Sequence, residues 1–232
     1  MHNKFVKRDT KLTNLIENSL KNGIKKRVFE LNNEVFSIED LTSCQRKIIY
    51  KSLGVLNSEE ESISTKTIDR EFVVKKWIYL FSRCKGLKVV DSNITVSDGN
   101  YNLSGTTDIV VKCKDVLGAI NIEPVNQETY SLAKNNNGLR RHIIKLMSIL
   151  WLTELENGIL IYENKNDNDY FLLHVIVNPA VIESIKNKYE LLIKNKVFGE
   201  IPDRPYKNSE NNECKNCVYL DKCWIDNKKK ER

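Results

Sequence analysis

The sequence of 232 residues contains no apolar run approaching the roughly 20 residues needed to cross a bilayer, so we expect no membrane partner. Its start, Met1-His2-Asn3-Lys4, carries charge without an apolar stretch behind it, which predicts no secretory signal. It also contains no internal repeat, which argues against a repeat architecture. We therefore expect the protein in the cytoplasm or, if the gene is viral, in the cytoplasm of the host.

The composition is that of a globular protein with a mildly basic charge. Hydrophobic residues make up 41% and charged residues 29% of the chain, and the length suits one domain with a buried core. The 37 Lys and Arg against 31 Asp and Glu give a net charge of +6, spread along the chain rather than gathered in blocks. This balance favours a polyanionic partner.

The hydrophobic pattern alternates between helical and strand periods, which predicts an α/β fold. Helical patterns occupy 10–28, 37–50, 68–84, 139–155 and 179–197. Ser37 is the expected N-cap of the second helix. Runs rich in β-branched residues predict strands at 87–91, 94–96, 101–112, 116–125, 158–163 and 170–177.

Three of the six cysteines are clustered near the end of the chain. Cys214, Cys217 and Cys223 have the spacing C-x2-C-x5-C, within a tail that is polar from Pro202 onward. Disulfides are unlikely to form in a reducing compartment, so clustered thiols point to a metal site. Cys84 and Cys113 stand alone in apolar or strand-like contexts, and we expect them to be small core residues.

A fourth ligand is needed, because zinc and iron–sulfur centres usually take four. Cys44 is the best candidate, since it stands on the polar approach to a helix beside Arg46 and Lys47. Joining Cys44 to the three C-terminal cysteines would clip the N-terminal helix to the polar tail. Such a clip would explain what holds a tail that has little core of its own.

The early cysteine with Arg46 two residues on, followed by the distant C-x2-C-x5-C, resembles the iron–sulfur staple of the RecB-type nucleases. These include the CRISPR-associated exonucleases, the AddB nuclease domain and the eukaryotic nuclease-helicase. The resemblance spans about residues 36 to 224. It implies a structural 4Fe-4S cluster on the four cysteines, although zinc on the same ligands remains an alternative.

The resemblance also implies one domain over 1–232, with a PD-(D/E)xK restriction-endonuclease-like core at 68–197. This core has a mixed central sheet flanked by helices. Segments 36–50 and 202–224 would form the iron–sulfur region.

In such nucleases, carboxylates on adjacent strands hold Mg or Mn, and a lysine stands near the attacking water. Gly105-Thr106-Thr107-Asp108 resembles the motif of the first carboxylate, and Glu123-Pro124-Val125 resembles the E-x-K strand. The resemblance implies that Asp108, Glu123 and the Pro124 carbonyl hold the metal. Val125 stands where the family has its lysine. Without the resemblance, both acids could be ordinary solvated strand-end residues.

Two further motifs depart from the family pattern. Glu71 stands near the place of the usual histidine ligand and could bind a hard metal instead. The helix that carries Gln-x3-Tyr in the family has Lys145 and Ile149 at those positions. Lys145 could replace the missing lysine, or it could be an ordinary solvated helix lysine.

Cations and aromatic residues elsewhere in the chain are candidates for nucleic-acid contacts. Arg140 and Arg141 open the helix that would face the metal site, and together with Arg46 they are the candidate DNA-binding residues. His142 and His174 fit hydrogen-bonded structural residues better than metal ligands. Four aromatic residues at helical spacing are expected in the core rather than in a base-stacking platform: Phe72, Trp77, Tyr79 and Phe81.

Two functions follow. The first is a non-catalytic relative that binds DNA, as single strands or ends, or a nuclease, helicase or recombination partner. The second is a Mg- or Mn-dependent deoxyribonuclease in which Lys145 acts as the missing cation. Loss of the lysine, glutamine and tyrosine together favours impaired catalysis, because residues that act as a unit are jointly required.

Overall fold

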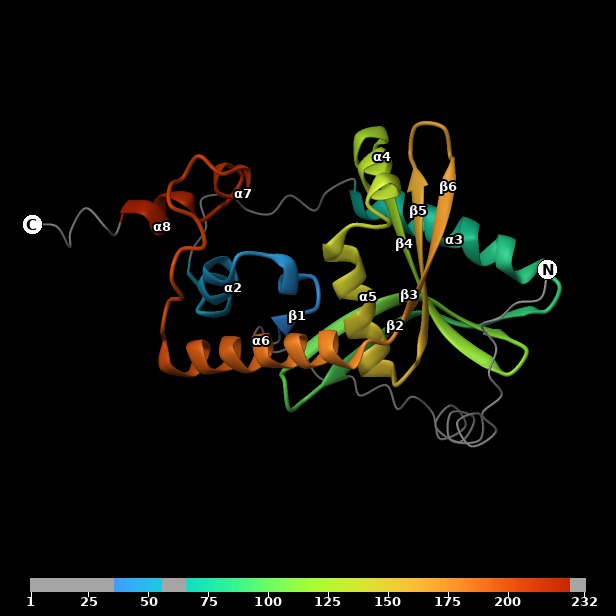
Figure 1. Cartoon of the computed structure of the whole chain (residues 1–232), viewed down its shortest axis with the longest axis horizontal. Coiled ribbons are helices and arrows are strands. Elements are labelled where there is room, and N and C mark those ends of the chain that lie inside the picture. Colours follow the sequence, from blue (N-terminus) through green and yellow to red (C-terminus); the bar gives the residue numbers. More distant parts are fainter. Residues whose placement is uncertain (1–35, 56–65, 226–232) are drawn as a thin grey trace, which may run out of the picture.

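The computed structural model describes residues 36–55 and 66–225, so the helical lead expected at 10–28 lies outside the described residues. Its helices and strands alternate along the chain (Figure 1). The helical elements are η1 (Asp40–Thr42), α2 (Gln45–Ser52), α3 (Lys66–Ser82), α4 (Gln127–Asn135), α5 (Arg140–Thr153), α6 (Pro179–Phe198), α7 (Asn212–Lys215) and α8 (Leu220–Ile225). The strands are β1 (Phe36–Ser37), β2 (Leu87–Asp98), β3 (Leu103–Cys113), β4 (Val116–Val125), β5 (Asn157–Asn164) and β6 (Tyr170–Ile176).

The strands form one six-stranded mixed sheet in the order β1-β3-β4-β5-β6, with β2 also paired to β3. β4 and β5 are parallel, as are β1 and β3, whereas the β2–β3, β3–β4 and β5–β6 pairs are antiparallel. The predicted α/β architecture with a mixed central sheet is therefore confirmed.

Helices cover both faces of the sheet, because alternate residues of each strand point to opposite sides. On one face, Ile120 and Ile122 of β4 pack with Trp77 of α3. On the other face, Ala119 belongs to a larger core with α5 and α6. Helix α5 lies against β3 and β4 on this face.

The N-terminal part of the described chain differs from the prediction. Ser37 does not cap a helix: Phe36 and Ser37 pair with Leu103 and Ser104 as strand β1, and α2 begins only at Gln45. The segments expected as separate strands at 87–91 and 94–96 form one strand, with a register shift between Val89 and Asp91. Both differences arise because β3 is long enough to pair with β1 and with all of β2.

Several expected core residues are exposed. Cys84 and Cys113 are both exposed, because Cys84 follows the end of α3 and Cys113 is the last residue of β3. On α3, Trp77 is buried as predicted, and so is Phe81, but Phe72 and Tyr79 are not. Only one side of α3 packs on the sheet, so aromatic residues on its other side remain in solvent.

The polar tail returns to the N-terminal segment at the far end of α6 from the sheet, where α7 and α8 lie near α2 (Figure 1). Arg46 Nη1 donates to the Pro202 carbonyl at 2.6 Å, and the Tyr50 and Tyr219 rings lie 5.5 Å apart. Helix α6 connects the sheet to this region. Asn178 caps its first turn, and Gly199, at φ +64°, ends it. Among the described residues, no helix has the length and apolarity that a membrane crossing requires.

Candidate functional sites: a carboxylate cleft and a cysteine pocket

Asp108 of β3 and Glu123 of β4 are both buried, with exposed fractions of 5% and 9%. Asp108 Oδ2 accepts the backbone N–H of Ile122 at 2.7 Å, which fixes its carboxylate against the neighbouring strand. Glu123 lines an open cleft of about 570 Å³ together with Pro124, Val125 and other residues. The alternative that these acids are ordinary solvated strand-end residues is therefore wrong.

Arg70 of α3 joins the two acids. Its Nη2 lies 3.1 and 2.9 Å from the two carboxylate oxygens of Asp108, and its Nη1 lies 3.6 Å from Glu123 Oε2. Burial raises the pKa of Asp108, although the Arg70 guanidinium and the Ile122 N–H favour the ionised form. A guanidinium thus lies between the two carboxylates that were expected to share a metal.

Lys145 of α5 also reaches this site. Its Nζ lies 3.1 Å from Glu39 Oε1 and 3.7 Å from Glu123 Oε1, and only 14% of its side chain is exposed. Burial acts to raise the pKa of Glu39, but Lys145 and Ser37 outweigh it and hold that pKa below its ordinary value. The solvated-lysine alternative is wrong, whereas a catalytic role for Lys145 stays a prediction.

His142 lies against the same carboxylate, with Nε2 3.8 Å from Glu123 Oε2. Its ring is hydrogen-bonded on both sides: Arg141 Nε donates to Nε2 at 3.0 Å, and Nδ1 lies 3.0 Å from the Tyr162 hydroxyl. Burial lowers the pKa of His142 to about 4, so the imidazole is neutral at physiological pH. His142 is a hydrogen-bonded residue, as expected, but its place beside Glu123 was not foreseen.

Glu71 is not brought to the site. Its carboxylate is exposed and pairs with Lys75 Nζ at 2.6 Å, one turn along α3. Successive side chains of a helix point about 100° apart. Because Arg70 points toward Asp108, Glu71 points into solvent. The role assigned to Glu71 is corrected accordingly. Sequence reasoning missed both Arg70 and Glu39, because neither belongs to a motif that marks the site.

The carboxylate donors fit a hard cation in kind, since Asp108, Glu123 and the Pro124 carbonyl are the oxygen ligands that Mg and Mn prefer. Glu123 Oε1 is buried and has no hydrogen-bond partner among the described residues, which suits a ligand atom. No three His, Cys, Asp or Glu side chains in the described ranges are grouped closely enough to hold an ion. The donors are therefore present, and Arg70 must move before a cation can bridge them.

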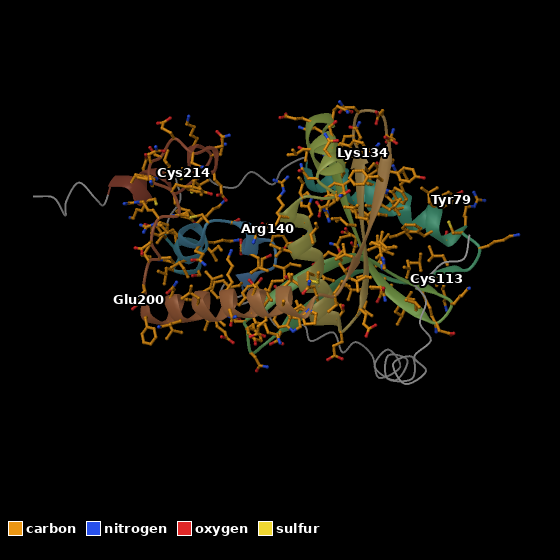
Figure 2. All side chains as sticks on the ribbon, in the orientation of Figure 1. Tyr79, Cys113, Lys134, Arg140, Glu200 and Cys214 are labelled. Carbon is orange, nitrogen blue, oxygen red and sulfur yellow. The ribbon has the colours of Figure 1, made fainter. Side chains whose placement is uncertain are left out.

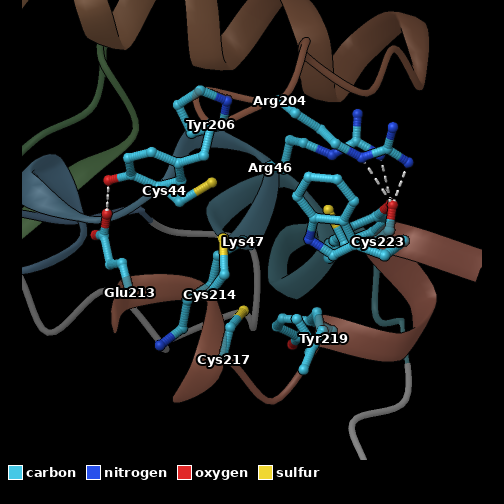
Figure 3. A pocket seen from close by; sticks show the side chains of 14 residues that line it. Cys44, Arg46, Lys47, Arg204, Tyr206, Glu213, Cys214, Cys217, Tyr219 and Cys223 are labelled. Atoms are coloured by element: carbon cyan, nitrogen blue, oxygen red, sulfur yellow. Dashed lines mark hydrogen bonds between the residues drawn. The ribbon is translucent and has the colours of Figure 1, made fainter. Parts of the chain in front are cut away.

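The second site is a small pocket of about 30 Å³ that all four candidate ligands line: Cys44, Cys214, Cys217 and Cys223. Figure 3 shows their sulfur atoms around one space, between α2 and the tail. Burial raises the pKa of the Cys214 thiol, and negative charge on the other three cysteines would raise it further. Cys113 does not contribute, because it lies at the opposite end of the molecule from Cys214 (Figure 2).

These thiols fit zinc or iron in kind, as soft donors in the number that either centre takes. The pocket is also lined by the cations Arg46, Lys47 and Arg204 and by the carboxylate of Glu213. In the described part of the chain the thiols are nevertheless not drawn together to the spacing of a bound ion. Their convergence from both ends of the described chain is what the sequence led us to expect.

The three candidate DNA-binding arginines are differently placed. Arg46 is half-buried and donates to the Pro202 carbonyl and, at 2.9 Å, to the Tyr50 hydroxyl, so it ties α2 to the tail instead of facing a ligand. Arg140 and Arg141 are exposed in the first turn of α5, and Arg141 also lines the carboxylate cleft. DNA contact therefore stays a prediction for all three arginines, and Arg46 does not line the carboxylate cleft.

No protein-family model matches this chain, and no curated protein matches it. Among solved structures it is similar to an alkaline exonuclease (LHK-Exo) from Laribacter hongkongensis, with a TM-score of 0.57 and 13% identity over 74% of this chain and 92% of that chain. It is similar to SSO0001, with a TM-score of 0.54 and 16% identity over 94% and 97% of the two chains. It is also similar to a phage-related exonuclease from Haemophilus somnus 129PT, with a TM-score of 0.50 and 12% identity over 75% and 99%. The fold is similar to that of solved exonucleases.

The exonuclease fold agrees with the nuclease-like core that the two strand motifs predicted. A further structure of the Laribacter hongkongensis enzyme is a complex with dAMP, with a TM-score of 0.55 and 12% identity over 72% of this chain and 90% of that chain. At such identities the likeness extends to the fold alone. The iron–sulfur centre and the state of catalysis remain predictions.

Proposed function

We propose that this protein binds DNA, as single strands or ends, through an exonuclease fold in which metal-dependent cleavage is impaired. The observation that carries the proposal is the guanidinium of Arg70, which bonds both oxygens of Asp108 and approaches Glu123. Fold likeness to exonucleases, one of them solved with dAMP, supports DNA as the partner.

The charges at the cleft explain the impairment. Glu39, Asp108 and Glu123 are offset by Arg70 and Lys145, while His142 is neutral. A metal ion would have to displace a charge-assisted contact in which one guanidinium nitrogen, Nη2 of Arg70, lies within hydrogen-bonding distance of both Asp108 oxygens, and charge-assisted hydrogen bonds are stronger than neutral ones. Val125 supplies no cation beside the place where water would attack. Binding without efficient cleavage fits both features.

The cysteine pocket would hold a 4Fe-4S cluster on Cys44, Cys214, Cys217 and Cys223, with zinc on the same residues as the alternative. Such a centre would join α2 to the tail and stabilise the fold without taking part in chemistry. A DNA-binding protein of this kind would act in the cytoplasm with a nuclease, helicase or recombination partner that supplies cleavage or unwinding.

One observation favours the second candidate, an active Mg- or Mn-dependent exonuclease. Glu123 Oε1 is buried without a hydrogen-bond partner among the described residues, and Lys145 Nζ lies 3.7 Å from it. Once a metal had displaced Arg70, Lys145 would be near enough to orient a water molecule. A bound metal would supply water activation and charge neutralisation.

Anaerobically purified full-length protein, incubated with labelled single-stranded and duplex DNA in Mn, distinguishes the two candidates. We expect salt-sensitive binding without cleavage. Cleavage that both Asp108→Ala and Lys145→Ala abolish, while the exposed-site control Glu71→Ala retains it, would replace our proposal with the active exonuclease. A wild-type protein that binds neither DNA would remove both.

A further inference from the structure

A groove of about 890 Å³ runs between the first turns of α5 and α6, with η1 as one wall. Arg140, Arg141 and Lys188 line it, and no Asp or Glu does. Arg140 and Arg141 are exposed, and neither pairs with a carboxylate in the described ranges. Three cations and no carboxylate in the lining make the groove a positively charged surface.

The backbone adds to this charge at one end of the groove. Leu139, the residue before α5, has no side chain that could cap the helix, and no side-chain cap is present. The N–H groups of His142 and Ile143 donate to the Leu139 carbonyl, whereas those of Arg140 and Arg141 have no side-chain cap. An uncapped N-terminus flanked by two arginines suits the oxygens of a phosphate.

Part of the groove lining is apolar. Ile143 and Ile144 of α5 and Ile185 of α6 line it together with the cations. A duplex would present its phosphates and keep its bases stacked inside, so the apolar lining would gain nothing from it. A single strand offers both phosphates for the cations and unstacked bases for the apolar side chains.

The groove leads to the carboxylate cleft. Arg141 lines both cavities, so a chain of phosphates that contacts Arg141 from the groove side would have its next linkage near Arg70 and Glu123. We propose that the groove between α5 and α6 binds single-stranded DNA and directs its end across Arg141 into the carboxylate cleft. This inference rests on the proposed function and specifies its substrate path.

The same groove depends on the segment that carries Cys44. Leu41 and Thr42 form its wall, and the Nζ of Lys188 donates to the Leu41 carbonyl. Cys44 lies only two residues beyond Thr42. A metal centre that fixes Cys44 against the tail would therefore also fix the wall of the DNA groove.

Fluorescence anisotropy with the full-length protein tests the path, using 5′-labelled oligo(dT) of five and twenty nucleotides across a KCl series. Arg140→Gln should weaken binding of the longer oligonucleotide and lower its salt slope by about 0.7. Arg140→Gln/Lys188→Gln should weaken this binding about tenfold and lower the slope by about 1.4. The five-nucleotide probe should lose less, because it can occupy the cleft alone. Lys85→Gln/Lys194→Gln removes the same charge from exposed positions outside the groove and should bind like the wild type.

Arg140→Gln keeps the test independent of folding, since the described structure gives its guanidinium no carboxylate partner. Wild-type affinity and salt slope in both groove variants would overturn the inference while leaving the proposed function intact. Equal loss in the control pair would overturn it too, because the effect would then be one of net charge. A duplex bound as tightly as the single strand would contradict the single-stranded path. A wild type that binds no DNA would instead remove the proposed function itself.

Discussion

Nη2 of Arg70 lies 2.9 and 3.1 Å from the two carboxylate oxygens of Asp108. Arg70 therefore occupies the oxygens that Asp108 would need to offer to a metal ion. This single pair decides how the cleft behaves. With Arg70 in place, the guanidinium offsets the charge of Asp108 without a metal ion. With Arg70 withdrawn, two buried carboxylates would face each other, and their repulsion would favour a divalent ion.

Arg70→Gln should therefore tighten Mn binding. We expect the dissociation constant to fall about tenfold, since roughly 1.4 kcal/mol less is needed when no guanidinium has to be displaced. Electron paramagnetic resonance of free Mn measures the change in metal-stripped protein. Lys75→Gln, on the exposed side of the same helix, is the matched control. Unchanged or weaker Mn binding in Arg70→Gln would show that the arginine does not compete with metal.

Val125→Lys should restore cleavage if the missing lysine limits it. Val125 lines the cleft with Glu123 and Arg70, so a lysine there would enter the same space. A positioned acid or base contributes typically about 100-fold or more, and we expect a gain of that order in Mn-dependent hydrolysis of single-stranded DNA. Val125→Met fills similar space without charge and should remain as slow as the wild type. No gain over Val125→Met would mean that Arg70 or another feature limits the reaction.

His142 should make folding sensitive to acid. Burial lowers its pKa from 6.5 to about 4. Between these two values the unfolded chain binds a proton that the folded chain does not, so the free energy of unfolding falls as the pH drops through this window. Above pH 6.5 the contribution is complete.

The full effect is about 3 kcal/mol, as an order of magnitude. Urea unfolding in EDTA at pH 7 and pH 4 measures it. His142→Gln should lose correspondingly less stability than the wild type over this range, and His174→Gln, at an exposed histidine, should match the wild type. Parallel losses in wild type and His142→Gln would mean that His142 is protonated in the folded protein.

The polar residues of the two central strands could be predicted from the sequence because their motifs are local. Asp108 directly follows Gly105-Thr106-Thr107 within one strand, and Glu123 lies within the next strand. Strand alternation and pairing therefore bring the two acids together. The resemblance of this segment to the family's site-facing helix likewise implied that Lys145 would approach the site. These inferences needed only one element at a time.

Long-range contacts explain what the sequence did not reveal. Strand β1 exists because Phe36 pairs with Leu103, 67 positions later in the chain (103 − 36 = 67), and no local pattern marks such a pair. Arg70 reaches Asp108 because of the direction in which it leaves α3. The side chain of the next residue along the helix points about 100° away, so the sequence alone does not show which residue faces the sheet. Helix α4 has no clear signal in the sequence, because it is only nine residues long and most of these residues are polar.

Cys44→Ser should remove the metal centre. Anaerobically purified wild type should contain iron and show the broad visible absorbance of an iron–sulfur cluster, or contain zinc and be colourless. Cys44→Ser should lose the metal and expose the tail to limited proteolysis, because ligand binding is coupled to folding. Cys113→Ser, at the exposed and distant end of β3, should retain both. A wild type with neither iron nor zinc, or Cys44→Ser with full metal content, contradicts the assignment.

Gly105 connects the two sites through packing, and its replacement should be costly. A Cβ at this position would overlap the buried side chain of Ile38, whose N–H also donates to the Ser104 carbonyl at 2.9 Å. Gly105→Ala should therefore destabilise the protein by about 1–3 kcal/mol, the usual cost of overpacking. Gly99→Ala, where a Cβ meets nothing, is the control.

Ile38→Val shortens the side chain that the new Cβ would overlap, so it should recover part of the stability lost in Gly105→Ala. A double-mutant cycle, with each free energy of unfolding measured in urea, gives this recovery as a coupling energy between the two positions. Ile38 lies six positions before Cys44 (44 − 38 = 6), so the strained variant should also weaken metal retention in the cysteine pocket. Additive effects of the two substitutions, with metal content unchanged, would show that β1 and the cysteine pocket are energetically independent of the strand that carries Asp108.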